Sequence, residues 1–574
     1  MKRNDLPAQL RSHGATLYLL LSVLLVSVEL FCFYHEISPQ TSRRIWVAVA
    51  LIDTIVLVTP YWWLPRRWRW AVLVPVWILS VFYVGNLVYM RFWGRLMPLT
   101  LLNQAGNTND VLVDSILGML RSSDMLYLVV PVLVTLIWCM RPLRGMVKAQ
   151  SYSVRERIIA TVFVIFAFLI GQYIMSKDKT TTFMRQISAY EILVRKVDAF
   201  RHPSPDTKSY FCTFGQNVYL LYQLGSLPAS STIKLSASEK ERLKEYCALA
   251  DLQKNIIAEN IGKNLIFIIV ESLNADMVDF RINGREVTPN LNALAQSPQS
   301  ITSLHVRPQI VGGNSADGQL MYNIGLLPTR IYVGGSDFVP YLDHLPGLGY
   351  IFSNNNKMDC TAVFADPGDG WNKMKAYRKY GYDRIYNSDS IRAHTPAGMS
   401  RDGAMFQYAL ERVDSMARPF HLQLLTIQMH GPCNEPVKDF TNYTGTGLYR
   451  SEQLYINCTA DFDRHLGEFI RGLKKRGVWE NTVLVIASDH CVPNSVRADG
   501  EPADIVFIAA NVGRGERVEQ EVHQADVFPT VLDIMGIEGG WRGVGRSMLG
   551  PRRGESDVRQ AGVSDSLLRS DYFK

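Results

Sequence analysis

Asn264-Leu-Ile-Phe-Ile-Ile-Val-Glu271-Ser272 is the stretch that decides the fold of the second half of the chain. Six apolar residues, β-branched and aromatic, follow one another without alternation and end at a carboxylate. A continuous apolar run of this length predicts a strand buried on both faces, as in a parallel sheet covered by helices. Because ligands of open α/β sheets bind beyond the carboxyl ends of the strands, Glu271 lies where a cation could use it.

A second stretch has the same design. Thr482-Val-Leu-Val-Ile-Ala-Ser488 is followed directly by Asp489 and His490. Two buried strands that each end in metal-type ligands predict one site assembled from distant parts of the chain.

Strand and helix patterns alternate through the rest of this region, which predicts a mostly parallel α/β domain over residues 262–574. Helices are expected at Arg401–Met416 and Leu454–Lys475. The expected strands are Leu265–Val270, Cys360–Phe364, His421–Ile427, Val483–Ala487 and Ile505–Ala509.

The composition is uneven along the 574 residues, which are too many for one ordinary domain. Hydrophobic residues make up 47% and charged residues 20% of the chain. The first third reads as membrane-spanning, and the formal net charge of +7 is explained by Lys and Arg beside the apolar spans. We therefore expect a membrane protein that does not bind nucleic acid.

Residues 1–176 are predicted to form a transmembrane domain of five helices, because a membrane helix needs about 20 apolar residues. The spans are expected at Ala15–Tyr34, Ile45–Leu64, Trp70–Met90, Met125–Met140 and Ile158–Met175. Lys and Arg are more frequent on the N-terminal side of the predicted membrane, which places the N-terminus in the cytoplasm and the later domain outside it. Glu29 and Asp53, in or near spans, are expected to reach the interface.

Residues 177–261 are predicted to be a helical juxtamembrane linker. Phe183–Phe200 and Val111–Leu120 have the spacing of amphipathic surface helices, although Phe183–Phe200 equally fits a connector packed on the next domain. Ser236–Asn255 is expected to be a charged helix capped by Ser236 or Ser238. Six of the eight cysteines lie outside the spans and could pair in an oxidising compartment, but their spacing gives no connectivity.

Further polar residues complete a possible centre. In Val311-Gly-Gly-Asn-Ser315-Ala-Asp317-Gly-Gln319, glycines precede a hydroxyl at a predicted helix start, which suits a phosphate group. A hydroxyl nucleophile needs a lowered pKa, and coordination to a divalent cation supplies it. Two carboxylates, one histidine and this oxygen would make a four-ligand site.

The ordered set of motifs resembles the alkaline phosphatase/sulfatase superfamily, and within it the lipoteichoic acid synthase branch of membrane phosphoglycerol transferases. The resemblance covers nearly the whole chain. Its pieces are the five spans, Val-Glu271-Ser-Leu, Thr288-Pro-Asn-Leu-Asn-Ala-Leu, Asn314-Ser-Ala-Asp317, Gly370-Trp-Asn-Lys373, Tyr380-Gly-Tyr-Asp, His430, Ser488-Asp-His490 and the segment from His523 to Gly536.

The resemblance implies a role for each matching residue. Glu271, Asp489 and His490 would bind the metal, and Ser315 would be both ligand and nucleophile, forming a covalent phospho-intermediate. The head group of the substrate would be held by Trp371, Lys373 and His430, with His430 also a candidate proton donor to the leaving oxygen.

Three positions depart from the branch. Ser315 replaces a threonine, which keeps the hydroxyl, and Lys373 replaces an arginine, which exchanges a bidentate phosphate fork for a point charge. The segment after His490 lacks a further histidine often found nearby. A sulfatase that converts Ser315 to formylglycine is set aside, because the proline and arginine which that conversion requires are missing after Ser315.

The favoured function is the transfer of phosphoglycerol from phosphatidylglycerol to a polymer or glycan of the cell envelope, in a bacterial cytoplasmic membrane. Phosphoethanolamine transfer from phosphatidylethanolamine, and a binding or sensing protein with a drifted site, stay open as alternatives. One divalent metal is expected. The resemblance favours Mn²⁺, while Zn²⁺ and Mg²⁺ also suit the predicted ligands.

Overall fold

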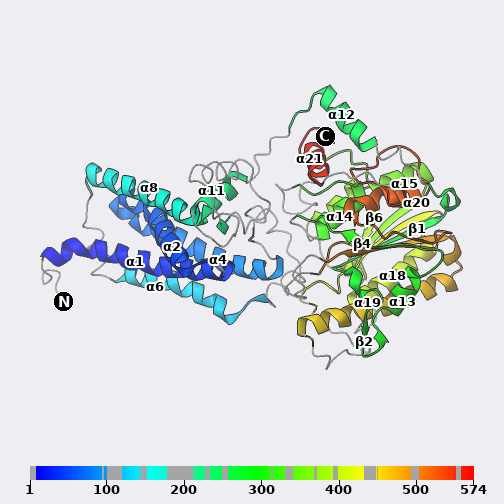
Figure 1. The fold of residues 1–574 in the computed structure, drawn as a ribbon, viewed down its shortest axis with the longest axis horizontal. Coiled ribbons are helices and arrows are strands. Elements are labelled where there is room, and N and C mark those ends of the chain that lie inside the picture. Colours follow the sequence, from blue (N-terminus) through cyan, green and yellow to red (C-terminus); the bar gives the residue numbers. More distant parts are fainter. Residues whose placement is uncertain are drawn as a thin grey trace. The chain divides into compact units, whose positions relative to one another are not determined.

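A computed structural model of the chain gives the fold with which these predictions are compared (Figure 1). Its helices and strands belong to two compact units, one made of Met1–Leu99 and Met119–Leu227 and another that includes Pro228–Lys574. The domain bounds predicted at residues 176 and 261 stay a prediction. The described residues are 8–39, 41–93, 96–97, 99, 119–140, 144, 152–176, 211–212, 214–226, 233–248, 256–311, 315–329, 339, 342–366, 372–391, 399–431, 433, 448, 450–492, 503–550 and 557–574.

Among the described residues of the first unit there are five apolar helical spans, as predicted. Each is long and apolar enough to cross a membrane, and the spans are Tyr18–Ile37, Arg43–Trp63, Arg66–Arg91, Ser122–Cys139 and Val154–Met175. They are built from α1 (Ala8–Ile37), α2 (Arg43–Val58), α3 (Pro60–Trp63), η1 (Arg66–Val72), α4 (Leu73–Trp93), η3 (Ser122–Leu128), α6 (Val129–Cys139) and α8 (Val154–Ser176).

Glu29 and Asp53 do not extend to the surface of the helical unit, so the prediction of side chains that reach out to water is wrong. Both are buried among the helices, 4% and 3% exposed. Asp53 accepts hydrogen bonds from the Tyr34 hydroxyl at 2.5 Å and from the backbone N–H of Gln216 at 3.0 Å. Buried partners therefore replace water around the Asp53 carboxylate.

Three helices with described bounds fall within the predicted linker, namely α11 (Gln216–Ser226), α12 (Ala237–Ala248) and the short η6 (Ala258–Asn260). α11 belongs to the first unit, and α12 belongs to the second. Ser236 caps α12, since its Oγ accepts from the backbone N–H of Glu239 at 3.3 Å. The predicted surface helix at Phe183–Phe200, and all but the last two residues of Val111–Leu120, lie outside the described residues.

The second unit is built on one mixed sheet with the strand order β10-β4-β9-β8-β1-β7-β5-β6, with β11 also paired to β4. β9 runs antiparallel to both neighbours, while β8, β1, β7, β5 and β6 are parallel. The strands are β1 (Asn264–Val270), β4 (Ile301–Arg307), β5 (Asp359–Phe364), β6 (Arg384–Tyr386), β7 (Phe420–Leu425), β8 (Thr482–Ser488), β9 (Ile505–Ala510), β10 (Glu516–Arg517) and β11 (Val522–His523); β2 (Arg281–Ile282) and β3 (Arg285–Glu286) form a separate hairpin.

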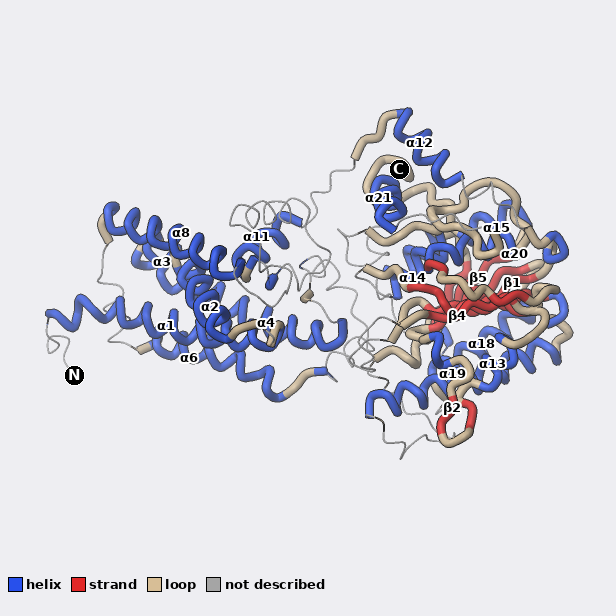
Figure 2. Tube along the Cα trace, in the orientation of Figure 1, coloured by secondary structure: helices blue, strands red, loops and turns tan. Residues whose placement is uncertain are grey.

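Helices cover both faces of the sheet, as the apolar run of β1 predicts (Figure 2). Leu265, Phe267 and Ile269 pack into the core on one face, while Ile266 and Ile268 pack on the opposite face. On the first face lie α14 (Ser315–Ile324), α15 (Leu348–Asn356), α16 (Lys373–Lys379) and α20 (Val527–Ile534), and on the second lie α13 (Pro289–Ala295), α18 (Arg401–Ser415) and α19 (Arg450–Lys475).

Candidate functional site

The predicted site residues that follow strands lie at one edge of the sheet, the one formed by the carboxyl ends of four neighbouring parallel strands. β8, β1, β7 and β5 lie side by side, so their carboxyl ends share an edge. Asp489 and His490 follow β8, Glu271 follows β1, and His430 lies in the turn after β7. Open α/β sheets bind ligands at such an edge.

Glu271, Asp489 and His490 form a buried cluster of ligand atoms. One ligand atom from each lies within 4.8 Å of the others, and the residues are only 3%, 2% and 2% exposed. Ser315, the first residue of α14, is half-buried beside them. Its Oγ lies 3.0 Å from Glu271 Oε2 and 3.2 Å from His490 Nε2. The four residues predicted from distant segments are thus in contact.

Backbone N–H groups orient the Asp489 carboxylate, and the hydroxyl of Ser272 orients the Glu271 carboxylate. Asp489 Oδ1 accepts from the N–H of Ser272 at 2.9 Å and from the N–H of His490 at 2.8 Å. The Ser272 hydroxyl donates to Glu271 Oε1 at 2.8 Å, and Ser272 turns sharply out of β1 with a φ of 54°. These bonds hold the carboxylates in one geometry without a flexible partner.

His490 is oriented by its second ring nitrogen. Nδ1 lies 2.8 Å from the carbonyl oxygen of Cys491, which assigns the Nδ1 proton to that bond. In the neutral ring the lone pair of Nε2 then faces Glu271 and Ser315. Ligand histidines of metal sites are held in this way.

The pKa values of the cluster are shifted because two buried carboxylates and a histidine lie close together. Burial raises the pKa of Asp489 to about 7, and the Glu271 carboxylate adds to the effect. Burial opposes the ionisation of Glu271, but the charge of His490 lowers its pKa to about 2. Burial lowers the pKa of His490, while Asp489 and Glu271 outweigh it and raise that pKa to about 10.

This donor set fits a divalent cation. Two carboxylates, one imidazole nitrogen and one hydroxyl supply four nitrogen and oxygen ligands, which suit Zn²⁺ and Mn²⁺, and with more water Mg²⁺. A cation held by these residues would offset both the burial and the repulsion from Glu271 that raise the pKa of Asp489.

Gly318 lets α14 approach the cluster closely. A Cβ added there would lie 2.4 Å from the carbonyl oxygen of Asp489 and 2.9 Å from its Cα. Asp317 Oδ2, one residue earlier, accepts from the N–H of Val311 at 2.8 Å. The start of α14, and with it Ser315, is therefore held against the end of β8.

Three supporting residues were missed by the sequence reasoning. The hydroxyl of Thr426 accepts from the N–H of Glu271 at 2.9 Å, and Gln524 Nε2 donates to the carbonyl of Asp489 at 2.5 Å. The Tyr322 hydroxyl donates to the carbonyl of Ser488. These contacts join segments far apart in the chain, and although Gln524 lies in one of the segments that carry the resemblance, the local sequence around Thr426, Gln524 and Tyr322 does not indicate which partners they contact.

The structure describes only two of the three residues predicted to hold the head group, Lys373 and His430. Lys373, 6% exposed, pairs with Asp366 just after β5, and its ammonium lies 4.9 Å from the ring centre of Phe364. Among the described residues, Lys373 and Ser315 have different polar partners: the Lys373 ammonium pairs with Asp366, and Ser315 Oγ contacts Glu271 and His490. His430 is close enough for its charge to contribute to lowering the pKa of Glu271, whereas Trp371 lies outside the described residues.

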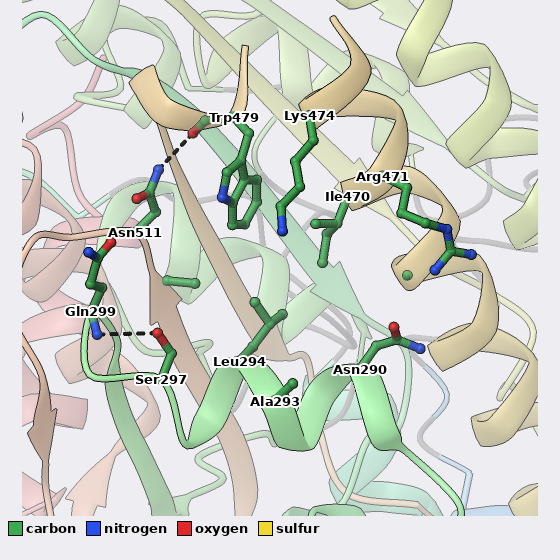
Figure 3. Close-up of a pocket in the computed structure, with 12 residues that line it drawn as sticks. Asn290, Ala293, Leu294, Ser297, Gln299, Ile470, Arg471, Lys474, Trp479 and Asn511 are labelled. Atoms are coloured by element: carbon green, nitrogen blue, oxygen red, sulfur yellow. Dashed lines mark hydrogen bonds between the residues drawn. The ribbon is translucent and has the colours of Figure 1, made fainter. Parts of the chain in front are cut away.

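A cleft of about 430 Å³ elsewhere in the second unit is separate from this centre (Figure 3). Trp479, which precedes β8, and Asn511, which follows the antiparallel β9, line it together with Arg471 and Lys474 of α19. These positions place the cleft at the amino ends of the parallel strands, whereas Glu271 lies at their carboxyl ends. None of the predicted site residues lines it.

Two family models match the chain in succession. The lipoteichoic acid synthase N-terminal domain matches residues 1–200, and the sulfatase family matches residues 263–537. The second match contains the four clustered residues.

Curated relatives match most of the chain at low identity. Lipoteichoic acid synthase 2 of Bacillus subtilis (strain 168) is 24% identical over 492 residues, which cover 82% of this chain and 72% of that protein. Lipoteichoic acid synthase of Staphylococcus aureus (strain bovine RF122 / ET3-1) is 22% identical over 558 residues, covering 91% and 82%.

One solved structure is similar over both units. It is the integral membrane protein lipooligosaccharide phosphoethanolamine transferase A from Neisseria meningitidis, which is 15% identical, covers 91% of this chain and 95% of its own, and has a TM-score of 0.51. This likeness shows a shared fold of apolar helices followed by an α/β domain.

Proposed function

Since the chain is a lipoteichoic acid synthase-like member of the alkaline phosphatase/sulfatase superfamily, we propose that it transfers phosphoglycerol from phosphatidylglycerol to a polymer or glycan of the cell envelope. The chain is an integral membrane protein with five apolar helices and an α/β domain. The proposal places it in a bacterial cytoplasmic membrane, with the N-terminus in the cytoplasm and the α/β domain outside.

The observation that carries the proposal is the position of the Ser315 hydroxyl. It touches both Glu271 and His490, and it lies on a half-buried residue at the start of a helix. A helix start favours a phosphate through its free N–H groups. A divalent cation held by Glu271, Ser315, Asp489 and His490, with Mn²⁺ preferred over Zn²⁺ and Mg²⁺, would lower the pKa of that hydroxyl.

Two displacements at phosphorus account for the transfer. Ser315 Oγ gives its proton to solvent and attacks the phosphorus of the lipid, the bond to the glycerol oxygen of diacylglycerol breaks, and that oxygen takes a proton for which His430 is the candidate donor. A hydroxyl of the acceptor then attacks the phosphoserine and releases Ser315. Trp371 and Lys373 are proposed to hold the head group, and Asp366 fixes the Lys373 ammonium.

Lipid vesicles test this function with the full-length protein in detergent or nanodiscs. Diacylglycerol release from phosphatidylglycerol should be lost in Ser315→Ala and retained in Ser315→Thr, since threonine keeps the hydroxyl. Ser315→Ala should keep more bound metal than Asp489→Ala, which removes one of the buried carboxylates. Equal release by Ser315→Ala and wild type would overturn the assignment.

Phosphatidylethanolamine vesicles are the matched comparison for the donor lipid. Release from these vesicles alone would change the transferred group to phosphoethanolamine. Purified protein with neither release nor bound metal would favour a binding protein over an enzyme.

A further inference from the structure

Two buried cysteines lie against each other beneath the turn that carries His430. Cys433 ends this turn and Cys458 lies in α19, and each is 1% exposed. Cys458 Sγ lies 3.9 Å from the carbonyl oxygen of Cys433, and the neighbouring Cys433 thiol raises the pKa of Cys458 further than burial alone. The pair thus joins the turn after β7 to α19.

Other contacts hold the same turn on both neighbouring helices. Asp402 of α18 accepts from the N–H of Ile427 at 2.8 Å, and Gln428 Nε2 donates to Asp461 of α19 at 2.7 Å. The Thr459 hydroxyl lies 3.2 Å from the sulfur of Met429. These bonds fix the turn just before Cys433 on α18 and on the part of α19 just after Cys458, so the two cysteines stay neighbours in the folded chain.

The backbone at Cys433 indicates that its side chain matters. Its φ is 58°, in the left-handed region that favours glycine, and its N–H donates to the carbonyl of His430 at 3.0 Å. A glycine would form this turn with less strain, so the sulfur is what a cysteine adds here.

We propose that Cys433 and Cys458 form a disulfide in the mature protein. The inference rests on the proposed placement of the α/β domain outside the cytoplasm, where thiols are oxidised. The two thiols lose two protons and two electrons as the S–S bond forms. A disulfide-bearing thiol oxidant of that compartment takes up both and leaves as a dithiol. Since both residues are buried, the exchange takes place during folding, before α19 covers the turn.

Peptide mapping of the full-length protein tests the bond directly. Protein is taken from membranes in the presence of N-ethylmaleimide, denatured and digested without reductant. The expected product is one linked peptide pair carrying Cys433 and Cys458, which disappears after reduction. Cys360, buried in β5, is the internal control and should be alkylated throughout. N-ethylmaleimide on both Cys433 and Cys458 in the unreduced sample would overturn the proposal.

Thermal unfolding supplies a second measurement. The bond would close a loop of 25 residues (458 − 433), and its reduction should lower the melting temperature by about 5 °C. Cys433→Ser, Cys458→Ser and the double variant should share the lowered value and no longer respond to reductant. A reductant effect that persists in the double variant would contradict the assignment. Loss of the bond with lipid transfer intact would leave the proposed function standing.

Discussion

Ser315 differs from the three other candidate ligands in its exposure to solvent and in the contacts that hold its side chain. Glu271, Asp489 and His490 are buried, and backbone groups hold Asp489 and His490 while the Ser272 hydroxyl holds Glu271; Ser315 is half-buried at the start of α14. A nucleophile must meet a lipid substrate, whereas ligands that only hold a cation gain from burial and fixed geometry. This division agrees with the proposed role of each residue.

Gly318→Ala tests how closely α14 must approach the end of β8. The added Cβ would lie 2.4 Å from a backbone oxygen of Asp489, so the helix start and Ser315 must shift. We expect transfer to fall by about 10²-fold, as a displacement of about 1 Å can cost that much. The free energy of unfolding should fall by about 1–3 kcal/mol.

Gly562→Ala in α21 (Asp557–Leu568) is the matched control, since its added Cβ meets no atom within 4 Å. That variant should keep transfer and gain about 0.5–1 kcal/mol of stability. Wild-type transfer in Gly318→Ala would show that the close approach does not position Ser315.

His421 in β7 makes stability depend on pH. It is fully buried, its Nε2 lies 2.8 Å from the Tyr382 hydroxyl, and burial lowers its pKa to about 3. In the unfolded chain this ring has a pKa of about 6.5, whereas in the folded chain it stays neutral to much lower pH. The free energy of unfolding is therefore independent of this group above about pH 6.5 and decreases as the pH falls from there towards 3. The loss is about 1.4 kcal/mol per pH unit.

His421→Leu should flatten this part of the stability curve, measured as melting temperature between pH 5 and 7.5. The hydroxyl of Tyr382 keeps a partner in Asn323 at 3.2 Å. Exposed His344→Gln is the control and should keep the wild-type slope. An unchanged slope in His421→Leu would show that His421 is not the group responsible.

Strand ends and helix starts position the buried polar contacts of both units. β1 and β8 were predictable because each is a continuous apolar run that ends in ligands, and the parallel pairing of Val270 with Ser488 brings those ends together. β4 was missed, since only its first residues are buried on both faces. The antiparallel direction of β9 was also beyond prediction, because direction depends on connections and not on the local pattern.

Asp53→Ala tests the contact between α2 and the start of α11 in the first unit. Asp53 of α2 accepts from the N–H of Gln216, the first residue of α11, and from the Asn217 side chain at 2.9 Å. Its removal leaves buried donors unpaired, which should cost about 2–4 kcal/mol and make α11 sensitive to protease. Asp53→Asn keeps one acceptor oxygen and should lose less.

Val47→Ala on the same helix is the control, because Val47 is exposed. It should leave the protease pattern unchanged. Equal protection of α11 in Asp53→Ala and wild type would contradict a docking role for the carboxylate.

The chain as a whole joins an apolar helical unit to a unit with a buried anionic cluster. Its motifs predicted five spans, the α/β class and the four clustered residues, because span length, apolar strands and their terminal ligands are local features. Gly318, Thr426 and Gln524 support the cluster through contacts between distant segments, which no local pattern specifies. Asp53 was misjudged for the same reason, since its partner Gln216 lies 163 positions away.

Removal of the metal should affect the stability and the activity of the α/β unit together. A chelator is expected to abolish transfer and to lower the free energy of unfolding by about 3–4 kcal/mol, with both restored by Mn²⁺. The reason is the repulsion between the buried Glu271 and Asp489 carboxylates. Asp489→Asn should unfold alike with and without chelator. A wild-type protein indifferent to chelation would contradict the metal site.

Mass spectrometry of the full-length protein after incubation with phosphatidylglycerol, without acceptor, is the most direct test of the central claim. Ser315→Ala serves as the control. The account predicts a covalent phosphoglycerol adduct on the peptide that carries Ser315, in the wild type alone. Metal-containing protein that consumes the lipid but never carries an adduct on Ser315 would contradict the two-step mechanism.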